Sequence, residues 1–371
     1  MIKLFLHIGF HKTGTTAIQN FLSANRQTLG KQGVLYPDLD PEWINHNPLS
    51  WELMDPNFMP ADAGYYHAYC ATGLWNKTFY QIAESGCDTA VLSGEDFSLV
   101  EHPEKVAEIC SGFETRVIIY IRRQDQVILS LYNQDVKDFA WMATKDLASY
   151  FWNHRMAQHI HYDRLIGKWA SAFSKEAVSV GVYEDRRLPN GLIGDFMERI
   201  GVGLDDAFAV EGFPANPSLP PLALELKRVL NHEALNKLEN DILVDAMRAS
   251  GMATQRQEGF TKHQDLTPSQ QAAFMERYAE GNRRVAIEYL DEDSTLFEDV
   301  VIGMKDDETC SINTEQLRLM VPLIRELVGR LYRNSRIWSE QQHWINFLES
   351  VVRKHSPEAI PGSGSSKENE S

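Results

Sequence analysis

A short segment near the N-terminus has the residue types of an oxyanion-binding loop. It reads Gly9-Phe10-His11-Lys12-Thr13-Gly14-Thr15-Thr16 and combines two glycines, three threonines and one lysine. Glycine lets the backbone approach an anion closely, and threonine hydroxyls, backbone N–H groups and an ammonium group all bind negative oxygens. Such loops bind anions best between a buried strand and the positive end of a helix. We therefore predict that an anionic cofactor is bound by His11, Lys12, Thr13, Gly14, Thr15 and Thr16.

The order of residues in this loop differs from that of a nucleoside triphosphate loop. The triphosphate loop has the pattern G-x-x-x-x-G-K-[ST]; Gly9 and Gly14 have its spacing, but Thr15 stands where its lysine belongs. The lysine of this chain, Lys12, lies inside the loop instead. No strand with a clear metal-binding carboxylate compensates for this change, so we predict no metal. A P-loop small-molecule kinase, which would bind ATP with magnesium, is the alternative that stays open.

Two motifs of this sequence together resemble one enzyme family. Lys12-Thr13-Gly14-Thr15-Thr16, after an N-terminal strand, resembles the 5′-phosphosulfate-binding loop of sulfotransferases that use 3′-phosphoadenosine-5′-phosphosulfate (PAPS). The stretch from Tyr120 to Tyr132, with an arginine at the end of a strand and a serine eight positions later, resembles the second motif of that family. The resemblance extends over residues 1–290 and is strongest to the bacterial, carbohydrate-type branch.

The resemblance implies a reaction and a set of residue roles. It implies in-line transfer of a sulfuryl group from PAPS to a hydroxyl or amine, with Arg122 and Ser130 holding the 3′-phosphate. A guanidinium group offers a charge-assisted fork to phosphate, and a serine hydroxyl adds a donor. Arg123 is the alternative to Arg122. Lys12 is expected to act catalytically, by placing positive charge where the leaving phosphate gains negative charge.

The attacking group of the acceptor also needs a general base. If the resemblance holds, the base lies between the two cofactor motifs, close to the end of an expected strand over Thr89–Leu92. Glu95 in Ser93-Gly94-Glu95-Asp96 stands there. Members of the family use either glutamate or histidine as base, so Glu95 is the first choice and His46 the second. A capping or ion-pairing role for Glu95, and loop hydrogen bonding for His46, are the structural alternatives.

The acceptor is predicted to be a carbohydrate hydroxyl or amine, because the resemblance favours the carbohydrate-type branch. Aromatic side chains that can stack on sugar faces occur in one region, although they can equally pack against one another. They are Trp43, Trp51, Tyr65, Tyr66 and Tyr69. A non-catalytic binding module of the same fold is a further alternative. A module of this kind would have lost the transfer activity. Against this loss stands the presence of Lys12, Glu95, Arg122 and Ser130.

The elements that position these motifs are expected to form a P-loop-like parallel sheet flanked by helices, an α/β fold. Short apolar stretches predict buried strands over Ile2–Ile8, Thr89–Leu92, Arg116–Ile121 and Val178–Tyr183. Spaced apolar residues predict a helix from about Thr15 to Gly30. Alternating strands and helices indicate parallel pairing, and ligands of such sheets bind at the carboxyl ends of the strands.

Beyond Asn216 the pattern becomes helical, which predicts a helical C-terminal region. Apolar residues recur every three or four positions over Leu222–Leu230, Gln270–Leu290, Leu317–Tyr332 and Trp338–Val352. We predict a sulfotransferase domain over 1–300, with an irregular insertion at 40–66 as a possible acceptor cleft. A helical C-terminal extension is expected over 305–354. The polar stretch 355–371 is expected to be a disordered tail.

The overall composition bounds the partners and the compartment. With 36 Lys and Arg against 52 Asp and Glu, the formal charge is −16, which disfavours nucleic acid and anionic membranes. We expect no membrane insertion and no export, hence a cytoplasmic protein. The cysteines Cys70, Cys87, Cys110 and Cys310 lack the spacing of a zinc site or a disulfide framework. His154, His159 and His161 also lack supporting ligands for a metal.

Overall fold

The structure is a computed structural model that describes most of the first 297 residues. The described ranges are 1–39, 43–54, 73–209, 218–219, 221–232, 235–249, 267–292 and 295–297. The C-terminal extension expected over 305–354, its two helices and the tail over 355–371 lie outside these ranges. In the part that is described, no helix has both the length and the apolar character needed to cross a membrane.

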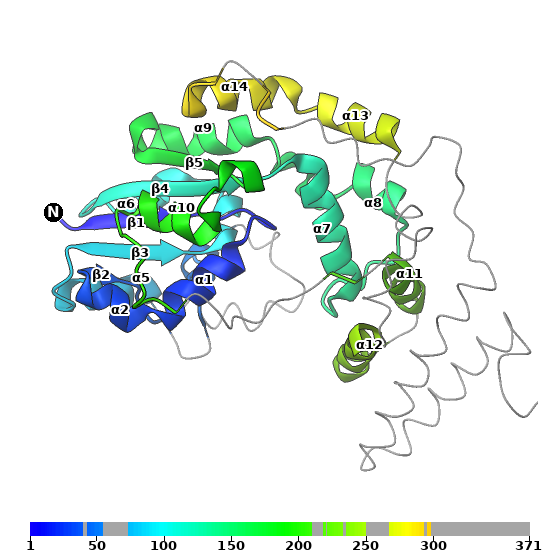
Figure 1. The fold of residues 1–371 in the computed structure, drawn as a ribbon, viewed down its shortest axis with the longest axis horizontal. Helices are drawn as coiled ribbons and strands as arrows, with labels where there is room; N and C mark the ends of the chain where they lie inside the picture. The colour runs from blue at the N-terminus through cyan, green and yellow to red at the C-terminus, as the bar shows by residue number, and fades with distance from the viewer. Residues whose placement is uncertain are drawn as a thin grey trace, which may run out of the picture. The chain divides into compact units, whose positions relative to one another are not determined.

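A five-stranded, fully parallel sheet forms the centre of the fold (Figure 1). Its strands, in the order in which they lie side by side, are β2 (Val34–Leu35), β3 (Thr89–Ser93), β1 (Lys3–His7), β4 (Glu114–Ile121) and β5 (Val178–Val182). The middle residues of the inner strands are apolar and largely buried, as expected for strands covered by helices on both faces. Four of the five strands are those predicted from the sequence. The two-residue strand β2 was not predicted, since so short a segment has no periodicity.

The register of the sheet brings the strand ends to one edge. His7 at the end of β1 lies opposite Ser93 at the end of β3, and Ile121 at the end of β4 lies opposite Val182 of β5. Because all pairs are parallel, the segments that follow β1, β3, β4 and β5 start from the same edge. The predicted phosphate loop is one of these segments.

The helices α1 (Thr15–Ala24) and α10 (Gly191–Arg199) cover one face of the sheet. Their apolar residues Ile18, Phe21 and Phe196 are fully buried against strand residues such as Val91. Complete burial of one such aromatic side chain stabilises the fold by about 2–3 kcal/mol. The predicted helix over Thr15–Gly30 is in fact two helices, α1 and α2 (Arg26–Lys31), which meet at Asn25.

Further helices follow the strands along the chain. Those that follow β2 and β3 are α3 (Asn47–Trp51), α5 (Leu74–Glu84) and α6 (Pro103–Ile109). Those between β4 and β5 are α7 (Gln124–Lys137), α8 (Leu147–Trp152) and α9 (Tyr162–Phe173). α9 packs on β4 and β5 and also contacts α6 and α14 (Ala279–Leu290). The predicted insertion over 40–66 therefore contains a short helix, α3, in its described part.

The chain divides into two compact units, and each of them consists of three separate segments. The first unit, 1–131 with 151–216 and 271–300, contains the whole sheet and the predicted site. The second unit comprises 132–150, 217–270 and 301–371. Its described part includes α11 (Pro221–Leu230), which was predicted, and α12 (Lys237–Ala249), which was not. The predicted helix over Gln270–Leu290 is divided into α13 (Pro268–Glu276) and α14.

Candidate functional site

The loop between β1 and α1 is a tight turn with three residues in the left-handed conformation. Gly9, Lys12 and Gly14 have φ values of 53°, 66° and 83°. A positive φ is unusual for a lysine, and strained backbone of this kind is found mostly at binding and catalytic sites. Thr13 is buried and donates its hydroxyl to the carbonyl of Phe10 at 2.7 Å, so it holds the loop in shape. The backbone of the loop thus lies at the edge of the sheet where a ligand would bind.

Gly14 has no room for a side chain. A Cβ atom added there would lie 2.3 Å from Cδ2 of Leu192 and 3.0 Å from the ring of Tyr183. Its carbonyl accepts the first hydrogen bonds of α1, from the N–H groups of Ala17 and Ile18. A side chain at Gly14 would therefore move the loop and the start of the helix together.

We expect Gly14→Ala to destabilise the protein by about 1–3 kcal/mol, the usual cost of a strained left-handed residue, and to disrupt the anion site. Denaturant unfolding and calorimetric titration with adenosine 3′,5′-bisphosphate measure the two effects. Gly30→Ala is the matched control, because nothing lies within 4 Å of a Cβ atom added at this helical glycine. Unchanged binding by Gly14→Ala would contradict a role for the loop in holding an anion.

Glu95 stands directly beside this loop. It begins the 3₁₀ helix η2 (Glu95–Leu99), two residues after β3 ends. The hydroxyl of Thr15 donates a hydrogen bond of 2.8 Å to Oε2 of Glu95. Glu95 also lies so close to Gly9 that no side chain would fit there. An added Cβ atom at Gly9 would lie 2.8 Å from Cα of Glu95. The carboxylate is thus held against the phosphate loop by both packing and a hydrogen bond.

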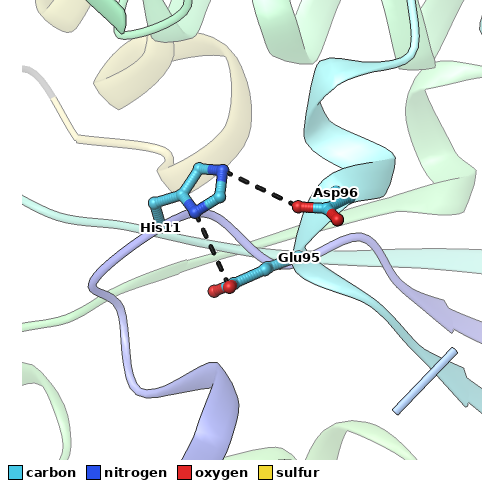
Figure 2. Close-up of side chains that lie close together, drawn as sticks. All are labelled: His11, Glu95 and Asp96. Carbon is cyan, nitrogen blue, oxygen red and sulfur yellow. Dashed lines mark ion pairs between the residues drawn. The ribbon is translucent and has the colours of Figure 1, made fainter. Parts of the chain in front are cut away.

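His11 lies between two carboxylates, as Figure 2 shows. Its Nδ1 is 3.7 Å from Oε1 of Glu95, and its Nε2 is 3.9 Å from Oδ1 of Asp96. One ligand atom from each of the three residues falls within 4.8 Å of the others, so this group could hold a metal ion. It is the one place in the described part of the chain where three such side chains come together. The sequence analysis, which predicted no metal, did not anticipate this cluster.

Arg122 reaches the loop from the end of β4. Its Nη1 donates to the carbonyl of Lys12 at 3.1 Å, and its Nε donates to Oε1 of Gln126 at the same distance. Its guanidinium carbon lies 5.4 Å from the centre of the Tyr183 ring, which is within cation–π range. Within the described residues, Nη2 of Arg122 takes part in no hydrogen bond. Arg122 therefore has donor capacity left for an anion beside the loop.

The other residues predicted to hold the 3′-phosphate differ in their surroundings. Ser130 lies in α7 and is partly buried, and the structure records no contact between its hydroxyl and Arg122 in the described part. Arg123, the alternative to Arg122, is buried and pairs with Asp125, with Nε at 3.0 Å from Oδ1. Asp125 belongs to α7, so this ion pair joins Arg123 to that helix, whereas Arg122 contacts the loop through the Lys12 carbonyl.

His46 occupies a structural position. It is buried at 1% exposure, accepts a hydrogen bond at Nδ1 from the N–H of Ser93, and contacts the carbonyl of Pro37 through Nε2. Burial lowers the pKa of His46 to about 3, so the ring is neutral at ordinary pH. With both ring nitrogens bonded to the backbone, His46 joins the end of β3 to the segment after β2. His46 therefore has no ring nitrogen left for a substrate proton, and Glu95 remains the predicted base.

Aromatic residues of the predicted acceptor region lie beside this cluster. Trp51 donates its indole N–H to Oδ2 of Asp96 at 2.7 Å, and its ring meets that of Trp43 edge to face at 5.2 Å. Tyr65, Tyr66 and Tyr69 lie outside the described residues. Sequence reasoning missed Asp96, Gln126 and Tyr183. The acidic pair Glu95-Asp96 in the sequence could have indicated Asp96. No local sequence pattern indicates the contacts of Gln126 and Tyr183.

Among the described residues, His154, His161, Cys87 and Cys110 have other surroundings. His154 accepts a hydrogen bond from the N–H of Met156, and His161 packs on Tyr278. Cys87 and Cys110 are free thiols, and Cys70 and Cys310 fall outside the described ranges. Burial raises the pKa of Cys110 to about 12, which keeps this thiol protonated and unreactive.

Comparison with known proteins gives distant likenesses among solved structures. No protein-family model and no curated protein matches the chain. Among solved structures, the chain is similar to a sulfotransferase from Alicyclobacillus acidocaldarius, at 17% sequence identity and a TM-score of 0.41. The match covers 62% of this chain and 96% of that chain. A likeness of this size leaves the assignment of an activity to the geometry of the site.

Proposed function

We propose that this protein is a sulfotransferase that moves a sulfuryl group from PAPS to a hydroxyl or amine acceptor. The observation that carries the proposal is the meeting of three groups at one sheet edge. A strained anion loop with a lysine inside it lies between a carboxylate, Glu95, and a guanidinium, Arg122. The transfer requires a site that binds the anionic donor, a group that accepts the proton of the acceptor, and a group that binds phosphate.

Each residue has a distinct task in the proposed reaction. The loop backbone and Lys12 bind the 5′-phosphosulfate, and Nη2 of Arg122, with Ser130, binds the 3′-phosphate. Glu95 takes the proton from the acceptor hydroxyl or amine as the new bond to sulfur forms. The bond between sulfur and the bridging oxygen breaks, and its electron pair stays on the 5′-phosphate beside Lys12. The aromatic pair Trp43 and Trp51 next to Asp96 supports a carbohydrate acceptor.

A kinase acting on a small metabolite is the second candidate, and one observation favours it. His11, Glu95 and Asp96 offer three ligand atoms that a divalent cation could share. Against it stands the loop, where the position after Gly14 holds Thr15 rather than the lysine that reaches the terminal phosphates of ATP. The two candidates differ in their cofactor, which makes them separable by binding alone.

The deciding experiment is calorimetric titration of the full chain with adenosine 3′,5′-bisphosphate in EDTA and, separately, with ATP and magnesium. We expect binding of the bisphosphate without metal and none of ATP. This result would be followed by transfer assays with PAPS and glycan acceptors. Binding of ATP with magnesium instead would replace the proposal with a kinase. Bisphosphate binding without any transfer to a broad acceptor panel would favour a non-catalytic module.

We expect Arg122→Ala to weaken binding of adenosine 3′,5′-bisphosphate by about 30-fold, which corresponds to about 2 kcal/mol for a charge-assisted hydrogen bond. Binding of adenosine 5′-phosphate, which lacks the 3′-phosphate, should change much less. Calorimetry with both ligands measures the difference. Arg116→Ala on the exposed part of β4 removes the same charge away from the loop and is the control. Equal losses for both ligands would refute the 3′-phosphate role.

A further inference from the structure

Arg122 stands just beyond the last strand contact of β4. The N–H of Tyr183 donates to the carbonyl of Ile121 at 2.8 Å, and β4 ends at Ile121. In the described sheet the register of β4 with β5 also ends there, at the pair of Ile121 and Val182. The sheet therefore does not fix the backbone of Arg122, and another element has to supply its hydrogen-bond partners.

That element is the start of α9, where Tyr162 is buried at 1% exposure. The hydroxyl of Tyr162 donates to the carbonyl of Arg122 at 2.6 Å, and the N–H of Arg122 donates to the same hydroxyl oxygen at 3.4 Å. One phenol group thus bonds both backbone polar groups of the arginine. The guanidinium group, which contacts the Lys12 carbonyl and Gln126, therefore extends from a backbone position that Tyr162 fixes.

The ring of Tyr162 packs against the phosphate loop. It meets the ring of Phe10 edge to face, with 5.5 Å between the ring centres, and Phe10 is fully buried. The carbonyl of Phe10 accepts from the hydroxyl and the N–H of Thr13, at 2.7 and 3.3 Å, which closes the turn of the loop. Tyr162 is thus in contact with both predicted anion-binding elements, the loop through its ring and Arg122 through its hydroxyl.

We propose that Tyr162 is a positioning residue for the donor nucleotide, which holds Arg122 at the distance from the phosphate loop that the 3′-phosphate requires. The 5′- and 3′-phosphates of PAPS are attached to one ribose ring, so the groups that bind them must be held at a matching separation. Tyr162 acts through Arg122 rather than on the reacting atoms. The inference rests on the proposed function for the identity of the ligand, whereas the fixing of Arg122 by Tyr162 can be measured without any ligand.

The first test follows the Nε–H of Arg122, which donates to Gln126, by nitrogen-15 NMR of the full chain without ligands. The signal is assigned by its loss in Arg122→Ala. Tyr162→Phe keeps the ring and removes only the hydroxyl, so the arginine leaves its partner more often. Hydrogen exchange of this N–H should become faster by about threefold to tenfold, the scale of one net hydrogen bond. The Nε–H of Arg199, which donates to Asp195 in α10, is the internal reference and should not change.

The second test is calorimetric binding of two nucleotides. Tyr162→Phe should weaken adenosine 3′,5′-bisphosphate by about threefold to tenfold and adenosine 5′-phosphate much less. In an Arg122→Ala background the same substitution should have no further effect, because its action passes through the guanidinium group. Tyr36→Phe is the matched control, and it should bind both nucleotides as the native protein does. It also removes a buried tyrosine hydroxyl that donates to a backbone carbonyl, that of Ile44 at 2.7 Å, but it follows β2, which two strands separate from β4.

The outcomes separate the inference from the proposed function. Unchanged exchange at Arg122 in Tyr162→Phe would overturn the inference. Equal losses for both nucleotides, or losses that add in the double variant, would also overturn it, because they indicate a general structural effect. If exchange at Arg122 becomes faster as expected while the native protein binds no bisphosphate, the proposed function fails and the positioning of Arg122 by Tyr162 stands.

Discussion

Glu95→Gln should lower turnover by about 100-fold or more while leaving the affinity for adenosine 3′,5′-bisphosphate nearly unchanged. Glutamine cannot take the proton of the acceptor, which removes general-base catalysis. Its amide oxygen can still accept the hydrogen bond that Thr15 donates to Oε2 in the native protein. The phosphate loop therefore keeps its anchor, and the variant separates the chemistry from the folding of the loop.

Steady-state rates at saturating PAPS and calorimetric binding of the bisphosphate are the two measurements. Thr15→Val is the complementary variant, because it breaks this hydrogen bond, which Glu95→Gln keeps, and leaves the carboxylate in place. A structural role for Glu95, carried by this hydrogen bond, predicts loss of activity and affinity in Thr15→Val and near-native values in Glu95→Gln. A full rate in Glu95→Gln would show that Glu95 is not the base. His46 could not replace it, because its ring is buried and both of its nitrogens are hydrogen-bonded to the backbone.

Lys12→Met should lower the rate of transfer by about two to three orders of magnitude, the scale seen when one donor that stabilises developing negative charge is removed. Methionine has a stem of similar length without the ammonium group. Lysine and methionine meet a similar cost for the left-handed backbone at φ 66°, so the variant removes the charge without adding backbone strain. The carbonyl that accepts from Arg122 is also retained.

Single-turnover rates with PAPS measure the effect on the chemical step. Lys31→Met, on the exposed end of α2, changes the net charge of the protein by the same amount and should act as native. An equal loss in both variants would mean that the overall field of this acidic protein, and not Lys12, controls the reaction. A Lys12→Met enzyme with the native rate would show that the leaving phosphate is stabilised by other groups.

The sheet could be predicted from the sequence because its strands have local signatures. Ile2–Ile8 and Arg116–Ile121 are mainly apolar stretches, and the strands β1 and β4 lie within them or overlap them. Helices α1 and α11 were predicted for the same reason, from their apolar period. The two-residue strand β2 and the helix α3 were missed, since segments of this length are selected by their neighbours rather than by their own pattern.

The composition of the site could also be predicted in part. Gly9, Lys12 and Gly14 belong to one loop, and the order of their types indicates anion binding without knowledge of the rest of the chain. Glu95 and Arg122 were predicted from the resemblance to the sulfotransferase family, together with their places at the ends of expected strands. Loop hydrogen bonding was the alternative predicted for His46, but its partners could not be predicted, because a loop histidine shows no sign in the sequence of which backbone groups will bind its ring.

What the sequence by itself determined is which residues follow buried strands, since apolar runs and glycine turns act over a few neighbouring positions. What only the tertiary structure decided is which of these residues meet. His11 and Glu95 are far apart in the chain and come together because β1 and β3 pair in parallel with His7 opposite Ser93. A shift of this register by one residue would turn the side chains of β3 to the other face and separate the pair. The meeting of His11 with Glu95 and Asp96 therefore depends on the packing of the sheet.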